Sequence, residues 1–382
     1  MPDVTVVGGG PAGSLSSRLL AASGLDVVVL EEHKQVGVPM HCAGMLTPET
    51  IRLSGVQPDI LGTITSADVV FPDGRVLDIG RRTPMIYVVD RVDLDQKLAD
   101  KACEFGVDFR YGVKCNRVTT DTKYAVADTN AGTIRSDIIV GADGPSSKVA
   151  TYVGHDLPRE IVVGMQADIR FRMDDQDRMI LRLGHDIAPG FFSWQLPMGD
   201  VTRVGVCVSP PFRPVDYLKK LISISGLEGM EVIQKFSGKI PIGGRRTTYA
   251  NRTLLIGDAA GQIKPVSGGG LYPIFKAAPV LCDTVNSAYQ LGVFNSSVLA
   301  LYERGWKRVI GKEISRGARM RHFYLKLNDE QMSSVGEIFD TPDIKESLGM
   351  IDFDDPSNIV KPILSQKGVK SGMLKAYLRK GR

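Results

Sequence analysis

Val4-Thr5-Val6-Val7-Gly8-Gly9-Gly10-Pro11-Ala12-Gly13 is the stretch that decides the fold. Its four β-branched residues favour a buried strand, and Gly8, Gly10 and Gly13 follow at the spacing G-x-G-x-x-G. Gly8 permits a tight turn, Gly10 lets the backbone approach a pyrophosphate, and Gly13 lets the next helix pack closely on the strand. The phosphates would lie at a helix N-terminus, where free N–H groups favour negative charge. Because the same spacing also occurs in ordinary turns, its context decides.

The residues that follow complete a βαβ unit. A helical pattern over 14–23 ends at Gly24, and a second apolar strand leads into Glu31 and Glu32. Glu31 lies 18 residues beyond Gly13, near where a carboxylate accepts hydrogen bonds from the adenosine ribose; the alternative is a solvated residue after a strand. A carboxylate there disfavours a 2′-phosphate, so we expect an unphosphorylated dinucleotide. The candidate cofactor-binding residues of this unit are Gly8, Gly10, Ala12, Gly13, Glu31 and Glu32.

Length and composition exclude several other classes of protein. The 382 residues suffice for about two domains, and the net charge is only +4. No region combines basic and aromatic residues in the manner of a nucleic-acid groove, so we expect no nucleic-acid partner. We see no signal-peptide pattern and no apolar run of about 18 residues, and therefore expect a cytoplasmic protein. The five cysteines and five histidines are scattered, which predicts neither a disulfide framework nor a metal site.

Local patterns along the chain predict its elements. Thr47, followed by a proline, is typical of a helix N-terminus. Alternation of apolar and polar residues around the turn Pro72-Asp73-Gly74 predicts a β-hairpin over 67–79. From Pro279 onward the periodicity is helical, and Leu299–Phe323 is the longest candidate helix.

The order of these elements predicts an α/β protein with a discontinuous cofactor domain. We expect the cofactor domain to comprise residues 1–60, 85–155 and 250–295. We expect an inserted, antiparallel, β-rich substrate domain from residues 61–84 and 156–249, and a helical C-terminal region over 296–382.

Three loops share a glycine-rich character and each follows a buried strand: Gly8–Gly13, Gly141–Gly144 and Gly257–Gly261. In a doubly wound sheet, ligands lie beyond the carboxyl ends of the strands, so these loops can converge on one elongated cofactor. Together with Glu31 and Arg91, the arrangement resembles the FAD-binding fold of the para-hydroxybenzoate hydroxylase superfamily. The resemblance implies a Rossmann-like FAD-binding domain, with FAD as the cofactor.

The same resemblance assigns roles to residues of the later loops. It implies that the first loop and Glu31 serve the AMP half of FAD, and that Asp143 serves the pyrophosphate and ribityl side. Asp258 would accept a hydrogen bond from a ribityl hydroxyl. Arg91 would contact the flavin or its phosphates, although a surface ion pair is an equally ordinary role for an arginine.

Within that superfamily the chain resembles the geranylgeranyl reductases, which saturate isoprenoid double bonds in archaeal lipid precursors and in phytyl and quinone side chains. Cys42-Ala43-Gly44 matches the Cys-x-Gly loop of that family, and Tyr87–Asp95 matches its arginine-containing strand-to-helix passage. Gly257–Gly261, followed by Pro265 and by Gly268–Gly270, matches its flavin loop. The resemblance implies a flavin-dependent reductase of prenyl lipids.

The substrate-domain signature of that family, Tyr-x-Trp-x-Phe-Pro followed by Gly-x-Gly, is present in altered form. Here the chain has Phe192-Ser193-Trp194-Gln195-Leu196-Pro197, and after seven residues Gly205-Val206-Cys207. Phe192, Leu196 and Cys207 depart from the signature, and each is apolar or small, so an apolar pocket remains. The candidate pocket residues are Phe192, Trp194, Leu196, Pro197, Gly205 and Tyr272.

Reduction of an unactivated alkene requires a hydride from reduced flavin and a proton, with little polarity to orient the substrate, so the site must act by shape. Gly268, Gly269, Gly270 and Leu271 are predicted to approach the flavin. Cys42, with Ala43 and Gly44, is predicted to lie beside the flavin, where it would supply the proton or only shape the pocket. A lone cysteine is more often inert.

The C-terminal segment Lys361–Arg382 carries seven basic residues and no acidic one. Met373, Leu374, Tyr377 and Leu378 give it an apolar stripe, so the segment is either a peripheral contact to an anionic membrane or a solvated basic tail. Its basic residues are Lys361, Lys367, Lys370, Lys375, Arg379, Lys380 and Arg382.

Three functions follow from these patterns. The first is an FAD-dependent reductase of prenyl double bonds, with an isoprenoid lipid as substrate. The second is a flavin monooxygenase that hydroxylates an aromatic substrate with NADPH and oxygen, and the third is a non-catalytic flavin-binding redox module. The electron donor, whether NAD(P)H, ferredoxin or another reduced carrier, is not identifiable from the sequence.

Overall fold

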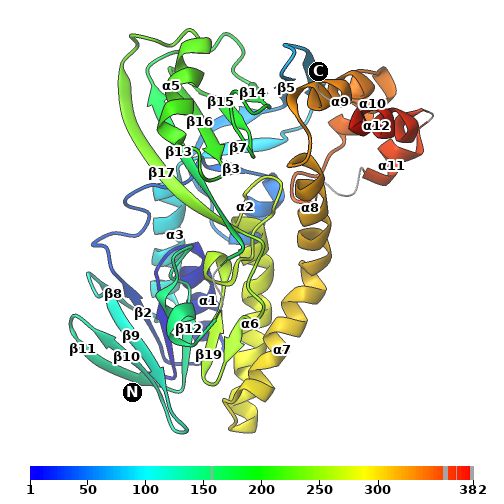
Figure 1. Ribbon diagram of the computed structural model, residues 1–382. Coiled ribbons are helices and arrows are strands. Elements are labelled where there is room, and N and C mark those ends of the chain that lie inside the picture. Colours follow the sequence, from blue (N-terminus) through cyan, green and yellow to red (C-terminus); the bar gives the residue numbers. More distant parts are fainter. Residues whose placement is uncertain (156–157, 356–359, 367, 379–382) are drawn as a thin grey trace.

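The computed structural model describes residues 1–155, 158–355, 360–366 and 368–378. Its lower half in Figure 1 is built on a six-stranded sheet in the order β18-β19-β12-β1-β2-β8. All four residues of β1 are buried, and β1 lies parallel to both β2 and β12. The strands are β1 (Val4–Val7), β2 (Val27–Glu31), β8 (Asp108–Tyr111), β12 (Ile138–Gly141), β18 (Tyr249–Ala250) and β19 (Thr253–Leu255).

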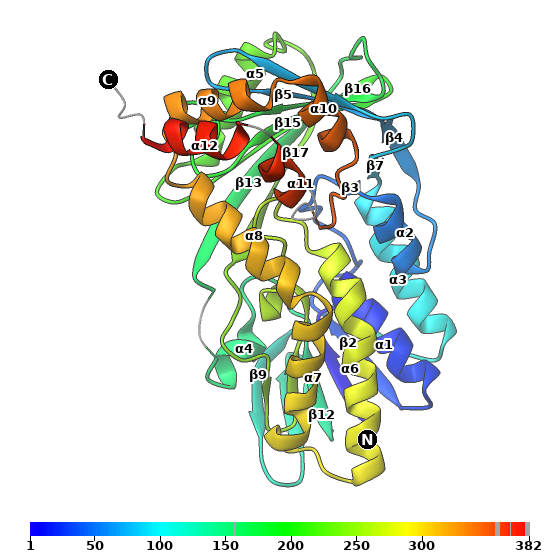
Figure 2. The ribbon, with the colours of Figure 1, turned by 90° about the vertical axis from the view of Figure 1, so that its right-hand side faces the viewer.

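The two faces of this sheet have different covers because side chains alternate along each strand. Val4 and Val6 pack into a core formed with α1 (Pro11–Ala22), α3 (Arg91–Glu104) and α6 (Leu271–Leu291). Val7, on the opposite face, packs against a three-stranded antiparallel sheet. The strands of that sheet are β9 (Cys115–Thr120), β10 (Ala125–Thr129) and β11 (Gly132–Ser136), and α4 (Lys148–Tyr152) lies beside them. The result is three layers: helices, parallel sheet and meander (Figure 2).

The upper half of the molecule contains a seven-stranded sheet in the order β17-β13-β16-β15-β14-β5-β6. Its strand pairs are antiparallel, except that β14 runs parallel to β5. The predicted hairpin is confirmed by the pairing of β5 with β6. The strands are β5 (Ser66–Val70), β6 (Val76–Gly80), β13 (Glu160–Ile169), β14 (Arg178–Arg182), β15 (Ser193–Met198), β16 (Val201–Val208) and β17 (Val232–Ile242).

One face of the seven-stranded sheet is covered by α5 (Pro214–Ile224), and Leu218 and Leu221 of that helix pack on Val204 and Val206 of β16. The residues that alternate with these two valines, Arg203, Gly205 and Cys207, lie on the opposite face of the strand because side chains alternate. That opposite face packs on the chain around Ala43. The division of the chain into a cofactor domain and a substrate domain remains our proposal.

A small sheet connects the two halves. It has the order β3-β7-β4, with β3 (Met45–Leu46), β4 (Ile60–Ile64) and β7 (Ile86–Val89). The predicted helix N-terminus at Thr47 is confirmed: its hydroxyl oxygen accepts a hydrogen bond from the amide of Thr50 at 3.0 Å and begins α2 (Pro48–Ser54). β7 then leads into α3, whose N-terminus is capped by the Asp90 carboxylate.

The helical C-terminal region differs from the sequence prediction in one respect. The segment Leu299–Phe323 is not one helix but two, α7 (Ser296–Val309) and α8 (Gly311–Tyr324), and α6, with 21 residues, is longer than either. The break falls at Ile310, which is buried in the core beside the six-stranded sheet and adopts non-helical dihedral angles before Gly311. Glycine at this position weakens the helix, and the burial of Ile310 fixes the bend.

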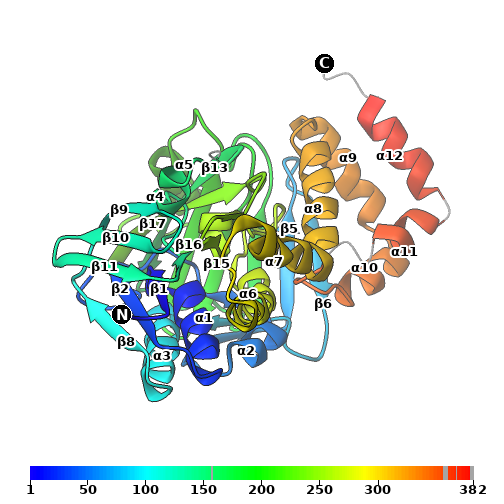
Figure 3. The same ribbon diagram turned by 90° about the horizontal axis from the view of Figure 1, so that it is seen from below.

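The last helices pack on the β5–β6 hairpin rather than on the parallel sheet (Figure 3). They are α9 (Asp329–Phe339), α10 (Pro342–Gly349), α11 (Val360–Ser365) and α12 (Val369–Leu378). Met373, predicted to belong to a membrane-facing stripe, packs against the apolar core that these helices form with the β5–β6 hairpin. Lys367, Arg379, Lys380 and Arg382 of the basic tail lie outside the described residues. Across the described part of the chain, no helix combines the length and apolar character needed to cross a membrane.

Candidate cofactor and substrate site

The three glycines of the first loop have three different environments. Gly8 has a φ of +100°, and a Cβ there would lie 2.4 Å from the carbonyl oxygen of Ala142. A Cβ on Gly13 would lie 1.9 Å from the carbonyl oxygen of Gly8, so α1 can pack on β1 only without a side chain at this position. At Gly10 a Cβ would meet nothing within 4 Å, which leaves open space beside the N-terminus of α1. This geometry fits a loop that receives a phosphate group.

Glu31 is buried at the end of β2 and its carboxylate is already engaged. One oxygen accepts the amide of Gly9 at 2.8 Å, and the other accepts the amide of His33 at 2.9 Å. Glu31 therefore fixes the first loop from the neighbouring strand. Glu32 is more exposed and pairs with Lys114 at 2.8 Å, and this hydrogen bond holds the pKa of Glu32 below its ordinary value.

A cavity of about 690 Å³ is lined by eight of the predicted cofactor residues. This volume lies within the range of about 300–1,000 Å³ typical of small-molecule and cofactor sites. Its wall includes the first loop, the segment from Val36 to Cys42 and, from the seven-stranded sheet, Val163 and Ser237–Lys239. The predicted residues along it are Gly8, Gly10, Glu31, Glu32, Cys42, Arg91, Asp143 and Asp258.

The carboxylate of Asp143 is directed into its own chain. It accepts a hydrogen bond from the Ser147 hydroxyl at 2.6 Å and from the amides of Lys148 and Val149 at 2.7 and 3.0 Å. Burial raises the pKa of this carboxyl, and the same hydrogen bonds oppose the shift. Asp143 thus caps α4 and fixes the conformation of the second loop. The predicted contact of Asp143 with a pyrophosphate stays a prediction.

Asp258 follows β19 in the short helix η1 (Gly257–Ala260). Burial raises its pKa to about 6, and the positive charge of Arg91 opposes this shift. Gly257 has a φ of +68°, and a Cβ there would lie 3.0 Å from Cβ of Ala12, so the first and third loops touch. The convergence of these loops, predicted from their positions after strands, is seen in the contact between Ala12 and Gly257.

Arg91 is buried and lines the same cavity. Its Nη2 donates to Asp95 at 2.9 Å, and it also interacts with the Cys42 thiol. Burial opposes the charge on Arg91, but Asp95 and Cys42 together raise the pKa of the guanidinium above its ordinary value. Nε of Arg91 is buried with no hydrogen-bond partner among the described residues. A buried donor left unpaired is costly, so this atom fits an acceptor on a bound cofactor.

Arg203, which sequence reasoning missed, and His41 position the Cys42 loop. Arg203, only 2% exposed, donates to the carbonyl oxygen of Ala43 at 2.7 Å and forms two hydrogen bonds with Asp168, at 2.7 and 2.8 Å. Nδ1 of His41 lies 2.7 Å from the carbonyl oxygen of Ser237 in β17. The signal available in the sequence was a single arginine inside the apolar run of β16.

Trp194 and Leu196 of the predicted pocket lie in one buried apolar cluster, which we call the prenyl cluster, and Phe192 packs against it. Trp194 lies over Gly205, where a Cβ would be 2.4 Å from the indole ring, and Phe192 meets Trp194 edge to face at 6.0 Å. Ala43 belongs to the same cluster. The buried members of the prenyl cluster are Ala43, Ile64, Ala67, Met85, Ile86, Val88, Val162, Met179, Phe191, Trp194, Leu196, Cys207 and Ile242.

Other predicted residues lie away from the cavity. Gly268, with a φ of +72°, packs between Ile240 and Phe191, and a Cβ on Gly270 would be 3.1 Å from Oδ1 of Asp258. Gly269 packs against the Lys264 side chain, Gly44 approaches the carbonyl of Val89, and Leu271 is buried in the core of the parallel-sheet half. Tyr272 turns toward Lys264 and Lys276, and Pro197 pairs with Thr202 between β15 and β16. Their predicted contacts with flavin or substrate therefore stay predictions.

Comparison with known proteins shows what the chain is similar to. Residues 1–182 match the family model described as the FAD binding domain. The cofactor of this part of the chain is FAD. The predicted FAD cofactor is thereby confirmed, and the fit of Gly10 and Arg91 to a phosphate-bearing cofactor agrees with it.

Among the described residues, no group of three or more His, Cys, Asp or Glu side chains is arranged to hold a metal ion.

Relatives and a solved structure extend this similarity to nearly the whole chain. The chain is 28% identical to digeranylgeranylglycerophospholipid reductase 1 of Methanococcoides burtonii, covering 92% of this chain and 90% of that protein. It is 29% identical to the digeranylgeranylglycerophospholipid reductase of Methanothrix thermoacetophila, covering 90% and 93%. A geranylgeranyl bacteriochlorophyll reductase-like structure from Thermoplasma acidophilum has a TM-score of 0.87 at 23% identity, covering 98% and 99%. The predicted resemblance to the geranylgeranyl reductases and the predicted fold class are confirmed.

Proposed function

We propose that this FAD-dependent oxidoreductase saturates isoprenoid double bonds, of the geranylgeranyl type, in lipid precursors. One observation carries the proposal. Cys42 lines the cofactor cavity, and the next residue, Ala43, belongs to the prenyl cluster with Trp194 and Leu196. The cofactor cavity and a large apolar surface therefore meet at adjacent residues. The similarity to proteins named digeranylgeranylglycerophospholipid reductase supports the same substrate class.

The chain's own residues would hold the cofactor as follows. The open backbone at Gly10 and the N-terminus of α1 receive the pyrophosphate, because unpaired amides and the helix dipole favour negative charge. Glu31 and Glu32 would hold the adenosine end, and Asp258 and Arg91, which line the same cavity, would hold the ribityl and flavin end. When bound, FAD in its reduced form supplies the hydride that adds to one carbon of the double bond.

The protein must supply orientation and a proton. A prenyl chain offers little polarity for recognition, so its position is set by apolar contact with Trp194, Leu196 and their neighbours. We propose that Sγ of Cys42 donates the proton to the second carbon. The thiolate left behind would lie beside the guanidinium of Arg91. Arg203 and His41 keep the loop that carries this thiol in position.

Two further partners belong to the proposal. An external reduced carrier, such as NAD(P)H or ferredoxin, returns electrons to the enzyme after each turnover. The basic segment Lys361–Arg382 contacts an anionic membrane from the cytoplasmic side, where a lipid substrate resides. Co-sedimentation with anionic liposomes tests this contact. Removal of 361–382 should abolish binding, and equal binding by the truncated and full chains would contradict it.

The decisive experiment for the proposed function is an anaerobic reaction of the reduced, FAD-loaded protein with a geranylgeranyl glycerophospholipid. We expect the reduced flavin to be reoxidised in step with the loss of double bonds from the lipid. Mass spectrometry of the lipid measures that loss. In a parallel arm, aromatic acids are tested for stimulation of NADPH oxidation in air. Stimulated oxidation without alkene reduction would instead support a monooxygenase. Slow reoxidation by every alkene would support a redox module.

A further inference from the structure

The prenyl cluster contains two side chains from a distant part of the sequence. Ile351 and Phe353, in the segment after α10, pack against its buried members, which include Trp194 and Leu196. They reach the cluster from the C-terminal region, whose other helices pack on the β5–β6 hairpin. Side chains from the C-terminal region thus contribute to the cover of the prenyl cluster.

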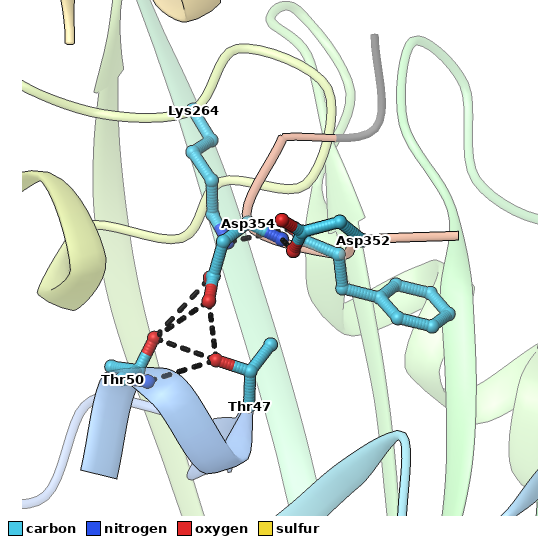
Figure 4. A network of polar contacts seen from close by, with 6 residues as sticks. Thr47, Thr50, Lys264, Asp352 and Asp354 are labelled. Carbon is cyan, nitrogen blue, oxygen red and sulfur yellow. Dashed lines mark hydrogen bonds and ion pairs between the residues drawn. The ribbon is translucent and has the colours of Figure 1, made fainter. Parts of the chain in front are cut away.

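A polar network centred on Asp354, the residue after Phe353, joins this segment to Thr47, Thr50 and Lys264 (Figure 4). Asp354 is only 2% exposed and accepts a hydrogen bond from the Thr47 hydroxyl, two from the Thr50 hydroxyl at 3.2 Å, and one from Nζ of Lys264 at 2.9 Å. Its amide donates to Asp352 at 2.8 Å. We call these contacts of Asp354 the clasp. A buried carboxylate with this many partners is a specific anchor, since its desolvation must be offset by each of them.

Backbone contacts fix the rest of the segment. Nζ of Lys264 also donates to the carbonyl oxygen of Phe353 at 2.9 Å, and Nη1 of Arg81 donates to that of Ile351 at 3.4 Å. Gly349 passes so close to β6 that a Cβ would lie 2.8 Å from the carbonyl oxygen of Gly80. The segment therefore contacts β6 of the seven-stranded sheet on one side and Lys264 on the other. Lys264 precedes the Gly268–Gly270 loop.

The space left beside the clasp is too small for a lipid chain. A cavity lined by Lys264, Val266 and Asp354, among others, has a volume of about 20 Å³. Sites for small molecules typically need about 300 Å³ or more. The cofactor cavity, in turn, includes neither Trp194 nor Leu196 in its wall. A prenyl chain can reach these residues only if other side chains leave them.

We propose that Ile351 and Phe353 form a plug that occupies the prenyl site, held by the clasp, and that a prenyl chain binds by displacing it. This inference rests on the proposed function. Because displacement has a fixed cost while apolar contact grows with chain length, the plug selects long isoprenoid chains over short ones. Phe353 is thus a specificity-determining residue, and Asp354 is the residue that positions it.

Hydrogen–deuterium exchange tests the displacement without reference to activity. The FAD-loaded protein is compared with and without geranylgeraniol, a twenty-carbon prenyl alcohol. We expect peptides over 350–355 to exchange about tenfold faster with the alcohol present, because the amide of Asp354 loses its partner. Peptides over α9 serve as the internal control and should be unchanged. Equal or slower exchange over 350–355 would overturn the plug.

Two variants test the effect on affinity. If the closed state dominates by about ten to one, Phe353→Ala and Asp354→Asn should each lower the KM for the twenty-carbon substrate by about tenfold. A residue with a merely structural role would raise the KM or leave it unchanged. Phe339→Ala and Asp340→Asn, in the same C-terminal region but outside the cluster, are the matched controls. An unchanged or raised KM in both test variants would contradict the proposal.

The two experiments also separate this inference from the proposed function. Faster exchange with geranylgeraniol, but no reduction of any prenyl substrate, would leave the plug supported and the reductase wrong. Alkene reduction with unaltered exchange and unaltered KM would leave the reductase supported and the plug wrong.

Discussion

Arg203 donates a hydrogen bond across 2.7 Å to the backbone carbonyl of Ala43, a residue 160 positions earlier in the chain. The contact joins the seven-stranded sheet to the loop that carries Cys42. Because Asp168 holds both Nε and Nη2 of Arg203, the guanidinium has one orientation available. The seven-stranded sheet thereby sets the position of a residue at the edge of the cofactor cavity.

Removal of this buried arginine should be costly. Arg203→Met leaves the Asp168 charge buried without its ionic partner, and we expect the free energy of unfolding to fall by about 3–5 kcal/mol. Chemical denaturation of the apoprotein measures it. Arg170→Met, which breaks an exposed pair with Glu231, is the control and should lower the free energy of unfolding far less, because solvent screens an exposed ion pair. Equal losses of unfolding free energy in the two variants would show that the buried pair of Arg203 and Asp168 does not stabilise the fold more than an exposed pair does.

Two glycines of the first loop should separate cofactor binding from folding. Gly10→Ala places a methyl group in open space, so thermal stability should be nearly unchanged while FAD affinity falls at least about tenfold. Gly13→Ala places a methyl group 1.9 Å from the Gly8 carbonyl oxygen, so the apoprotein itself should lose about 1–3 kcal/mol or more. FAD titration and thermal unfolding of both variants check this. The same stability loss in both would contradict it.

The raised pKa of Asp258 predicts a pH dependence of apoprotein stability. The pKa of Asp258 is about 6 in the folded chain and lower when unfolded, so the folded state binds the extra proton. The protonated carboxyl of Asp258 therefore favours the folded state. Its contribution to stability is complete below the unfolded pKa and is lost as the pH rises through about 6. Asp258→Asn should therefore unfold at a higher temperature than the native chain at pH 7–8, with the difference vanishing near pH 4. A difference that does not vary with pH would argue against a raised pKa.

Cys42 offers a direct test of proton donation. In single-turnover reactions with pre-reduced FAD, Cys42→Ala should slow alkene reduction by about 10²–10⁴-fold, the usual contribution of a general acid. Cys103→Ala, at an exposed free cysteine, controls for the loss of a thiol. FAD affinity should be measured alongside, to separate chemistry from binding. Native rates in Cys42→Ala would show that this residue only shapes the site.

Local signals in the sequence predicted the parts of the fold that depend on neighbouring residues. The spacing of Gly8, Gly10 and Gly13 predicted three environments that the structure contains, because backbone sterics act over a few residues. The hairpin at 67–79 and the helix start at Thr47 follow from turn and capping chemistry in the same way. The break at Ile310 was missed because burial against the core, rather than helical periodicity, determines it.

The site was only partly predictable for a related reason. Glycine loops after strands indicated where a cofactor binds, but they gave no sign that Glu31 is bonded to Gly9 or that Asp143 caps α4. The Arg203–Asp168 pair and the clasp of Asp354 join residues that are 35 to 307 positions apart. Such contacts depend on how sheets and helices are placed in space, which composition and periodicity do not specify.

The attachment of the C-terminal region to β6 has a consequence for solubility. β6 is the last strand of the seven-stranded sheet, and a free strand at that position would offer unpaired N–H and C=O groups to another molecule. Ile344 and Leu348 of α10 pack with Leu77 of β6, and the backbone of Gly349 lies against Gly80. The final helices thus cover the edge of the sheet at β6. In a chain cut before α9 this edge would be exposed, and β6 could pair with a strand of another molecule and aggregate.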